Sequence, residues 1–285
     1  MTNLSDYKSD DPIAWCPGCG NFGILNALKQ ALAELNLKPE DILMVSGIGQ
    51  AAKLPHYLKC NTFNGLHGRT LPVATGAKVA NQRLVVIADG GDGDGYAEGG
   101  NHFLHAMRRN INITYLVHNN QVYGLTKGQA SPTSDKGMVT GTTPEGYSIC
   151  PERPLALAVA SSCSFVGRGF VTEKEHLVHL MKEAIKNEGF SLLEILQPCV
   201  TFNKVNTNDW YRKRAYKLEE ENYDSTNRAE AFNKAMEWGD KIPIGIIYRC
   251  PRETYEQKAG LTGLPPLAEL ERKTDAVEEL FQEFY

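Results

Sequence analysis

LVVIADGGDGDGYAEGG, residues 84–100, joins an apolar run to a run of glycines, and this stretch decides the expected fold. Residues 84–89 predict a buried strand, and glycines directly after it let the backbone approach a phosphate group closely. A dinucleotide-binding fingerprint would place an acidic residue about 20 positions further on, at the end of the next strand. Here the acidic residues lie within the glycine run, which suits a metal ion better than a ribose.

Apolar strands and amphipathic helices alternate on both sides of this stretch. Helices are expected over 22–36, over 98–109, and from the capping box Thr172-x-x-Glu175 through Ile185. Further strands are expected at 41–47, 112–119, 165–171, 192–197 and 242–248. Because these strands are apolar throughout, they predict an α/β fold with a doubly wound parallel sheet covered on both faces. Ligands of such sheets bind beyond the carboxyl ends of the strands.

Composition limits the possible partners and the compartment. The 285 residues carry a net charge of −4, which argues against nucleic acid and against a basic membrane-binding patch. The first residues, MTNLSDYKSDDPIAW, lack the pattern of a signal peptide. No apolar run approaches the roughly 20 residues of a membrane span. We therefore expect a cytoplasmic protein whose seven cysteines are thiols or metal ligands rather than disulfides.

The second informative stretch is HNNQVYG, residues 118–124, at the end of the next expected strand. Asp92 and Asn120 then end neighbouring strands of one βαβ unit, so both side chains can reach a single cation. Mg²⁺ takes about six oxygen ligands, and these residues offer a carboxylate and an amide carbonyl. GDG alone could be a simple turn after a strand. Here residues 94–118 separate GDG from a following NN, and the combination of the two motifs favours the metal site.

GDG and NN at this separation resemble the thiamine diphosphate motif of thiamine-dependent enzymes. WCPGCGNFGIL, SGIG, LHGR, GDGD, RRN and YGLTKGQASPT, in this order, narrow the resemblance to the β subunit of 2-oxoacid:ferredoxin oxidoreductases. It covers the chain from about residue 12 to about residue 203. The resemblance implies a thiamine diphosphate-binding domain over 1–203, with cluster ligands, and a C-terminal extension over 204–285 for contacts between subunits.

The resemblance implies Mg²⁺ ligation by Asp92, by Asn120 and by the backbone carbonyl of Val122. His67 is expected near the diphosphate or the reacting centre, where its imidazole could donate a hydrogen bond; a packed structural histidine is the alternative. The residues expected to line the cofactor are Ser46, Gly47, Ile48, Gly49, His67, Gly91, Asp92, Gly93, Asp94, Asn120, Val122, Gly124, Leu125 and Thr126.

Cys16 and Cys19 lie in WCPGCG, residues 15–20. By itself such a pair can hold zinc, hold an iron–sulfur cluster or shuttle a disulfide. The resemblance implies a [4Fe–4S] cluster, with Cys199 of LQPC as a further ligand.

The remaining cluster ligand departs from the family pattern. SGIGC of the family reads SGIGQ here, so Gln50 occupies the position of a cysteine. We predict that Cys60, ten residues later, replaces it because its loop can fold back. Cys150, Cys163 and Cys250 are expected to bind no metal.

The resemblance implies thiamine-dependent oxidative decarboxylation of a 2-oxoacid to acyl-CoA and CO₂, with electrons passed through the cluster to ferredoxin, or the reverse carboxylation. Lys127 is expected to bind a second substrate carboxylate, which favours 2-oxoglutarate over pyruvate; an ordinary surface lysine is the alternative.

One sheet domain leaves no room for a pyrimidine-binding domain, so an α subunit in an (αβ)₂ assembly should supply it. The partners implied are that subunit, ferredoxin, coenzyme A and the 2-oxoacid, without nucleic acid or membrane. Two rival functions are a thiamine-dependent decarboxylase or synthase component without ferredoxin, and a zinc-stabilised assembly module.

Overall fold

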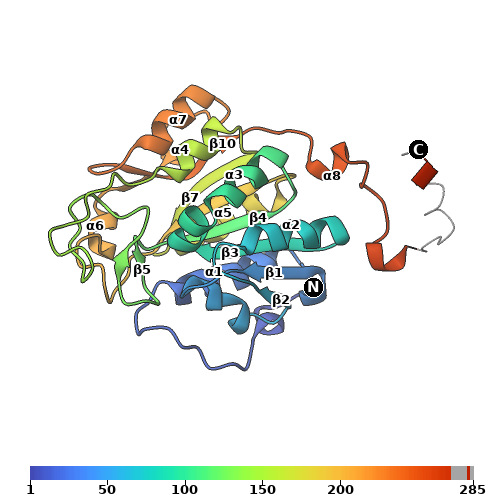
Figure 1. Ribbon diagram of the computed structural model, residues 1–285, viewed down its shortest axis with the longest axis horizontal. Helices are drawn as coiled ribbons and strands as arrows, with labels where there is room; N and C mark the ends of the chain where they lie inside the picture. Colours follow the sequence, from blue (N-terminus) through green and yellow to red (C-terminus); the bar gives the residue numbers. More distant parts are fainter. Residues whose placement is uncertain (271–280, 283–285) are drawn as a thin grey trace.

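A computed structural model describes residues 1–270 and 281–282. Its centre is an eight-stranded sheet in the order β2-β1-β3-β4-β8-β7-β10-β9, with helices on both faces (Figure 1). The α/β class is confirmed. The strands of this sheet are β1 (Ile42–Ser46), β2 (Asn61–Asn64), β3 (Val85–Gly91), β4 (Thr114–Asn119), β7 (Phe165–Phe170), β8 (Ser191–Leu196), β9 (Ala215–Lys217) and β10 (Ile242–Arg249). A separate antiparallel hairpin consists of β5 (Val122–Tyr123) and β6 (Gln129–Ala130).

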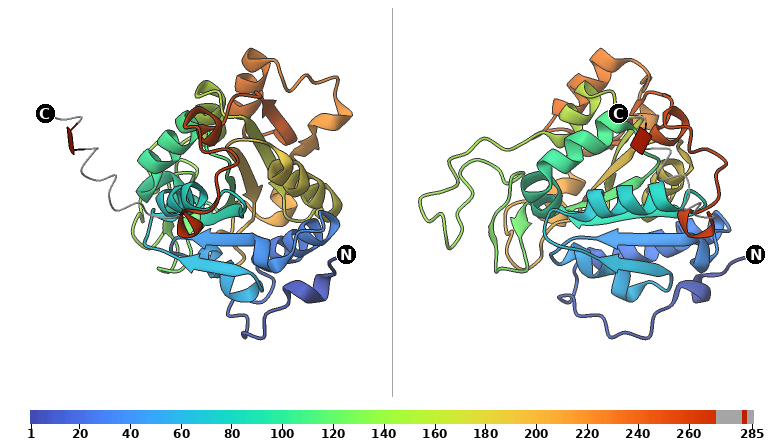
Figure 2. Two further views of the ribbon diagram at one scale, coloured as in Figure 1. Left: turned by 90° about the vertical axis from the view of Figure 1, so that its right-hand side faces the viewer. Right: turned by 45° about the vertical axis from the view of Figure 1, so that its right-hand side comes forward.

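Two groups of helices cover the opposite faces of the sheet (Figure 2). One face is covered by α1 (Asn21–Glu34) and α5 (Lys174–Lys186). The other is covered by α2 (Thr70–Ala80), α3 (Gly100–Arg109), α4 (Pro154–Ala160) and α7 (Arg228–Met236). The shorter elements are α6 (Asn208–Arg212), α8 (Tyr255–Lys258), the 3₁₀ helices η1 (Leu4–Tyr7), η2 (Pro39–Asp41), η3 (Ala51–Tyr57), η5 (Leu218–Glu220) and η6 (Leu267–Glu269), and the π-helix η4 (Gly93–Glu98).

The apolar strand β3 shows why both faces need cover. Val86 and Ala88 pack in the same core cluster as Phe103 of α3. Ile87, between them, packs on the opposite side with Leu28 of α1. Alternate side chains of a strand point to opposite faces, so a continuously apolar strand has to be buried from both sides.

Two details differ from the sequence-based expectation. β10 runs antiparallel to β7, whereas the six strands from β2 to β7 in the sheet order pair in parallel with one another. An antiparallel strand near the edge of an otherwise parallel sheet is common. The predicted capping box is wrong, because α5 begins at Lys174 after Glu173 and has no side-chain cap. Thr172 therefore lies one residue too early to bond the first turn.

The expected extension over 204–285 contributes to the sheet, since β9 and β10 both come from it. Near residue 270 the chain lies against the main domain, where Arg83 Nη1 is 3.0 Å from Glu269 Oε1. The boundary at 203 and the role of the extension in contacts between subunits stay predictions. Residues 271–280 and 283–285 of the extension lie outside the described residues. Within the described ranges, no helix combines the length and apolar character needed to cross a membrane.

Candidate active site

The candidate site lies at the edge of the sheet where the central parallel strands end. β1 and β3 are parallel, with Ser46 beside Asp89, and β4 and β8 are parallel, with Asn119 beside Leu196. The segments that follow these four strands therefore emerge together. They carry SGIG, GDGD, NNQVYG and LQPC, so parallel pairing brings these motifs to one edge.

Asp92 directly follows β3, in the middle of this edge of the sheet, and its side chain is fully buried. Its Oδ2 accepts hydrogen bonds from Ser131 Oγ and from Thr133 Oγ1, both at 2.5 Å. Burial raises the pKa of Asp92 to about 6, against the effect of these hydroxyl donors. No basic side chain of the described residues pairs with this carboxylate. A buried carboxylate without a counter-charge is costly, and a bound cation would remove that cost.

The loop after β4 brings an amide to the same pocket. Gln121 has a left-handed backbone, with φ of 60°, and is held by Tyr211, whose hydroxyl donates a 2.8 Å hydrogen bond to Gln121 Oε1. This turn leaves Asn120 and Val122 both lining the pocket that Asp92 lines. Asn120 Oδ1 accepts a 2.9 Å hydrogen bond from the Val122 amide. The three residues expected to bind Mg²⁺ are thus brought together.

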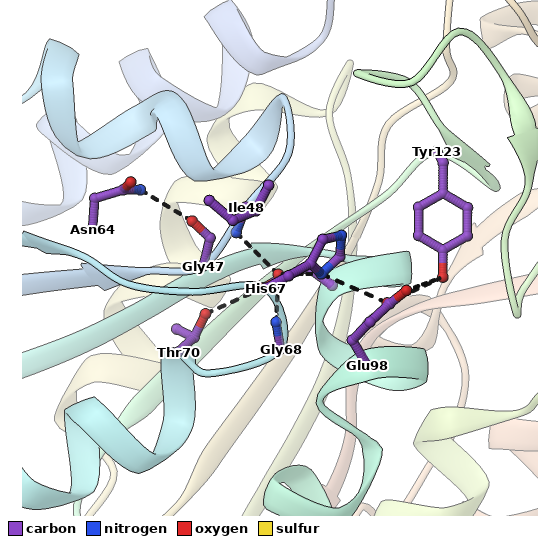
Figure 3. A network of polar contacts seen from close by, with 9 residues as sticks. Gly47, Ile48, Asn64, His67, Gly68, Thr70, Glu98 and Tyr123 are labelled. Carbon is purple, nitrogen blue, oxygen red and sulfur yellow. Dashed lines mark hydrogen bonds and ion pairs between the residues drawn. The ribbon is translucent and has the colours of Figure 1, made fainter.

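The buried side chain of Asp94 connects two loops of the site through hydrogen bonds. Its carboxylate accepts hydrogen bonds from the Ile48 amide at 3.0 Å, the Gly68 amide at 2.8 Å and Thr70 Oγ1 at 3.2 Å. His67 Nδ1 lies 3.0 Å from Asp94 Oδ1. Figure 3 shows Ile48, His67, Gly68 and Thr70 in this network of polar contacts. Asp94 therefore fixes the SGIG and LHGR loops on the glycine run, and it holds the His67 ring at the pocket.

Gly47 allows this arrangement. A Cβ atom there would lie 2.2 Å from Asp94 Oδ2, so any side chain would displace the carboxylate. The Gly47 carbonyl also accepts a 3.0 Å hydrogen bond from Asn64 Nδ2. A glycine is required here by close approach.

A second pocket adjoins the first and contains three thiols. Cys16, Cys19 and Cys199 line it together. Gln197 Nε2 donates to Cys19 Sγ at 3.3 Å, and the Phe202 amide donates to Cys199 Sγ at 3.4 Å. Burial raises the pKa of the Cys19 thiol, and the neighbouring sulfurs of Cys199 and Cys16 raise it further. Polar hydrogens directed at sulfur suit thiolates that bind a metal group.

The two pockets share a wall. Gln50, Asn120 and Gly124 line both the Asp92 pocket and the thiol pocket. A group bound among the thiols would therefore lie next to a group bound at Asp92.

The structure brings most of the expected cofactor residues to the first pocket, which also contains Gln50, Ala51 and Tyr123. The expected residues that line it are Ile48, Gly49, His67, Gly91, Asp92, Gly93, Asp94, Asn120, Val122, Gly124, Leu125 and Thr126. Ser46 lies behind it, where its hydroxyl donates to the Ala52 carbonyl at 2.9 Å. Lys127 is exposed and outside the lining residues, in a left-handed conformation with φ of 86°.

Cys60 is not brought to the thiol pocket. It directly precedes β2, whose register pairs Asn61 with Leu43 and Asn64 with Ser46 of β1. Cys60 is therefore at the amino end of its strand, on the opposite edge of the sheet from Cys199. Its sulfur donates to the Asn61 carbonyl at 3.3 Å, and burial raises its pKa to about 12. The predicted fold-back of this loop fails because residues 61–64 form a strand instead.

Sequence reasoning assigned no role to Ser131 and Thr133, the two residues that hold Asp92. Both belong to YGLTKGQASPT. The β5–β6 hairpin reverses the chain there, so the second half of this motif lies beside Asp92, one of the residues expected to bind Mg²⁺. The signal available in the sequence for this role was the pair of hydroxyl residues that follows the loop of this motif. His118 was also missed; it is fully buried, with Nε2 2.9 Å from Asp89 Oδ1.

A zinc site built from the cysteines would need four ligands around a single ion. Among residues 1–270 and 281–282, no three His, Cys, Asp or Glu side chains are close enough to hold one metal ion. Cys16, Cys19 and Cys199 do line one pocket. Metal analysis of the purified protein therefore decides between zinc and an iron–sulfur cluster.

Two family patterns match the sequence. The pattern of "Thiamine pyrophosphate enzyme, C-terminal TPP binding domain" matches residues 44–195. The pattern of the C-terminal part of the pyruvate ferredoxin oxidoreductase beta subunit matches residues 199–262. The first match contains Asp92 and Asn120, and the second begins at Cys199.

Individual proteins agree with these patterns. A 2-oxoacid:ferredoxin oxidoreductase subunit beta from Saccharolobus solfataricus is 46% identical over 257 residues, which cover 86% of this chain and 84% of that protein. The 2-oxoglutarate oxidoreductase subunit KorB from Mycobacterium tuberculosis is 46% identical, over 70% of this chain and 53% of that protein. The fold is similar to that of a 2-oxoglutarate:ferredoxin oxidoreductase from Magnetococcus marinus with 2-oxoglutarate, coenzyme A and succinyl-CoA bound. That comparison has a TM-score of 0.91 and 36% identity, and covers 99% of this chain and 96% of the other.

Proposed function

Since the chain belongs to the β subunits of 2-oxoacid:ferredoxin oxidoreductases, we propose that it holds both redox groups of that enzyme, thiamine diphosphate with Mg²⁺ and an iron–sulfur cluster. The family and the enzyme class inferred from the motifs are confirmed. The single observation that carries the proposal is the shared wall of the two pockets at Gln50, Asn120 and Gly124. Adjacent sites for a carbon-centred cofactor and an electron acceptor suit oxidative decarboxylation.

The Asp92 pocket fits a Mg²⁺-bound diphosphate. Asp92 would bind the cation through its buried carboxylate, Asn120 through its amide oxygen and Val122 through its backbone carbonyl. Ser131 and Thr133 orient Asp92 from behind, as neighbours of metal ligands commonly do. Thiamine diphosphate, when bound, supplies the nucleophilic carbon and takes up the electron pair left by CO₂. His67, which Asp94 positions, would donate a hydrogen bond at the pocket mouth.

The thiol pocket fits an iron–sulfur cluster. Cys16, Cys19 and Cys199 supply three thiolates, and the side chain of Gln197 and the amide of Phe202 direct hydrogens at the sulfurs. A cluster here, when bound, would supply one-electron transfer from the thiamine site to ferredoxin. The chain would position the two groups and exclude other acceptors.

We infer 2-oxoglutarate as the preferred substrate. The named activities of two relatives support it, since both act on 2-oxoglutarate by name. Lys127 lies one residue beyond Thr126, which lines the Asp92 pocket, and it is exposed toward solvent. Its ammonium would pair with the second carboxylate of the substrate once the α subunit encloses this loop. The reaction then yields an acyl-CoA and CO₂, and the reverse carboxylation uses the same site.

The activity requires partners. A β subunit implies an α subunit, which we propose supplies the pyrimidine-binding domain in an (αβ)₂ assembly. Residues 204–285 are proposed to contribute to that contact, and ferredoxin to dock near the thiol pocket. The cytoplasmic location also stays a proposal; it is supported by the seven cysteines, none of which forms a disulfide, as expected in a reducing compartment.

The test uses the chain co-expressed with its α subunit and purified without oxygen. We expect reduction of ferredoxin that requires 2-oxoglutarate and coenzyme A together, accompanied by release of CO₂. Release of CO₂ without ferredoxin reduction would contradict the proposal and favour the thiamine-dependent decarboxylase. Zinc in place of iron would favour the assembly module.

A further inference from the structure

The geometry points to Gln50 as the residue at the fourth corner of the cluster site, so that three thiolates hold three irons and an amide faces the fourth. This inference rests on the proposed cluster in the thiol pocket. It concerns a position where this chain departs from its family pattern, and it assigns Cys60 no role in the cluster.

The pocket contains three thiols and no fourth. Its lining combines Cys16 and Cys19 from the N-terminal motif with Cys199 from the segment after β8. No other cysteine of the described residues lines it. A cubane has four irons, so one corner must meet a different group.

Gln50 is fixed beside the cysteine motif by its backbone. Trp15, the residue before Cys16, donates from Nε1 to the Gln50 carbonyl at 2.8 Å. The Trp15 ring is buried and packs edge-on against Phe22 and Tyr57, at centroid distances of 5.4 and 4.8 Å. Gln50 also caps η3, with a helical backbone that fixes the start of its side chain. Both segments of the pocket are thus tied together at this residue.

The Gln50 side chain has an unused acceptor. Its Oε1 is buried and finds no hydrogen-bond partner within residues 1–270 and 281–282. Buried amide oxygens are normally satisfied, so an unpaired one beside three thiols points to a missing electrophile. An amide oxygen is a hard and weak ligand for iron compared with thiolate. The fourth iron would therefore be held loosely.

Cys60 cannot take this position without unfolding part of the sheet. It precedes the four residues of β2, which at ~3.3 Å each put it on the order of 13 Å from the carboxyl edge. Its sulfur already donates to the Asn61 carbonyl, and its half-buried side chain packs against the core cluster that includes residues of α1. The strand pairing of β2 with β1 would be lost if Cys60 moved.

The position of Gln50 indicates which pocket the loosely held iron would face. Gln50 lines the thiol pocket and the Asp92 pocket, so the fourth corner is the one nearest the thiamine site. An iron at this corner would exchange more readily than the three irons that thiolates would hold.

The test compares wild type with Gln50→Cys, Cys60→Ser and Cys199→Ser in the co-expressed complex. Each is reconstituted with iron and sulfide without oxygen, oxidised mildly, and measured by iron count and electron paramagnetic resonance. We expect wild type and Cys60→Ser to lose one iron of four and show the signal of a three-iron cluster, which added ferrous iron together with a one-electron reductant such as dithionite reverses. Gln50→Cys should keep all four irons, and Cys199→Ser should lose most of the cluster.

The outcomes separate the two claims. A four-iron cluster in wild type that survives oxidation and that Cys60→Ser destroys overturns the role of Gln50 and leaves the proposed function standing. Equal resistance of wild type and Gln50→Cys also overturns it. Absence of any iron–sulfur cluster from wild type overturns the proposed function together with this inference.

Discussion

Thr133 Oγ1 donates a 2.5 Å hydrogen bond to Asp92 Oδ2, although 41 residues separate the two in the chain. The same hydroxyl oxygen lies 2.9 Å from Asn119 Oδ1, at the end of β4. Thr133 therefore connects the ends of two neighbouring strands behind the metal residues. The carboxylate that we propose binds Mg²⁺ is oriented before any cation arrives.

Thr133→Val tests this preorganisation. Valine has nearly the same shape, so the change removes the hydroxyl and leaves one Asp92 lone pair unsatisfied. A lost bond to a charged group costs about 1.5–3 kcal/mol, or roughly 10- to 100-fold in the Mg²⁺ concentration needed to retain thiamine diphosphate. The measurement is a Mg²⁺ titration of cofactor binding, with Thr142→Val as the exposed control. Identical titrations for both variants would contradict the assigned role.

Gly47→Ala and Gly76→Ala form a matched pair for stability. A Cβ at Gly47 meets Asp94 at 2.2 Å, whereas nothing lies within 4 Å of a Cβ at Gly76 in α2. We expect Gly47→Ala to lower the free energy of unfolding by about 1–3 kcal/mol. Gly76→Ala should raise it by up to about 1 kcal/mol, since alanine favours the helix. Chemical denaturation measures both; equal effects would show that the Asp94 network tolerates displacement.

Lys127 carries the proposed substrate preference in a backbone conformation that suits glycine. Lys127→Gly removes the ammonium and should relieve strain at a φ of 86°, so stability should not fall. Loss of a charge-assisted bond predicts that kcat/KM for 2-oxoglutarate drops by about 10- to 100-fold. Steady-state kinetics with pyruvate should change little, and Lys136→Ala serves as the control. A similar drop on both substrates would leave Lys127 with a structural role only.

The thiols should differ in reactivity when no cluster is bound. Burial raises the pKa of Cys60 and of Cys163 to about 12, so at pH 8 both are almost entirely protonated. Cys16 and Cys150 are exposed. We expect iodoacetamide to label Cys16 and Cys150 first, and to label the half-buried Cys60 and the buried Cys163 at least tenfold more slowly, as followed by mass spectrometry. Early labelling of Cys60 would contradict its placement at the start of β2.

Much of this site could be predicted from the sequence because its residues directly follow the carboxyl ends of buried strands. A buried strand followed by GDGD, and another followed by NN, must bring Asp92 and Asn120 to one sheet edge if the strands are parallel and adjacent. The structure has that arrangement, with β3 paired directly to β4. The same logic brings Cys199, which follows β8, toward Cys16 and Cys19.

The parts that could not be predicted depend on how irregular segments fold. Cys60 was expected in a loop, but residues 61–64 add a short strand to the sheet edge and carry it away. The hydroxyls of Ser131 and Thr133 reach Asp92 only because the β5–β6 hairpin reverses the chain. Neither the short strand β2 nor the β5–β6 hairpin is marked in the sequence by a periodic pattern of apolar residues. Tertiary contacts decide such short elements, and propensity alone does not.

The central claim is that one chain holds two separate, adjacent cofactor sites. Its most direct test is the thiamine diphosphate and iron content of the assembled complex in Asp92→Asn and Cys199→Ser, measured on the same samples. Asp92→Asn should lose thiamine diphosphate and keep its iron, and Cys199→Ser should lose iron and keep thiamine diphosphate. Thiamine diphosphate at the wild-type level in Asp92→Asn, or iron at the wild-type level in Cys199→Ser, would contradict the account.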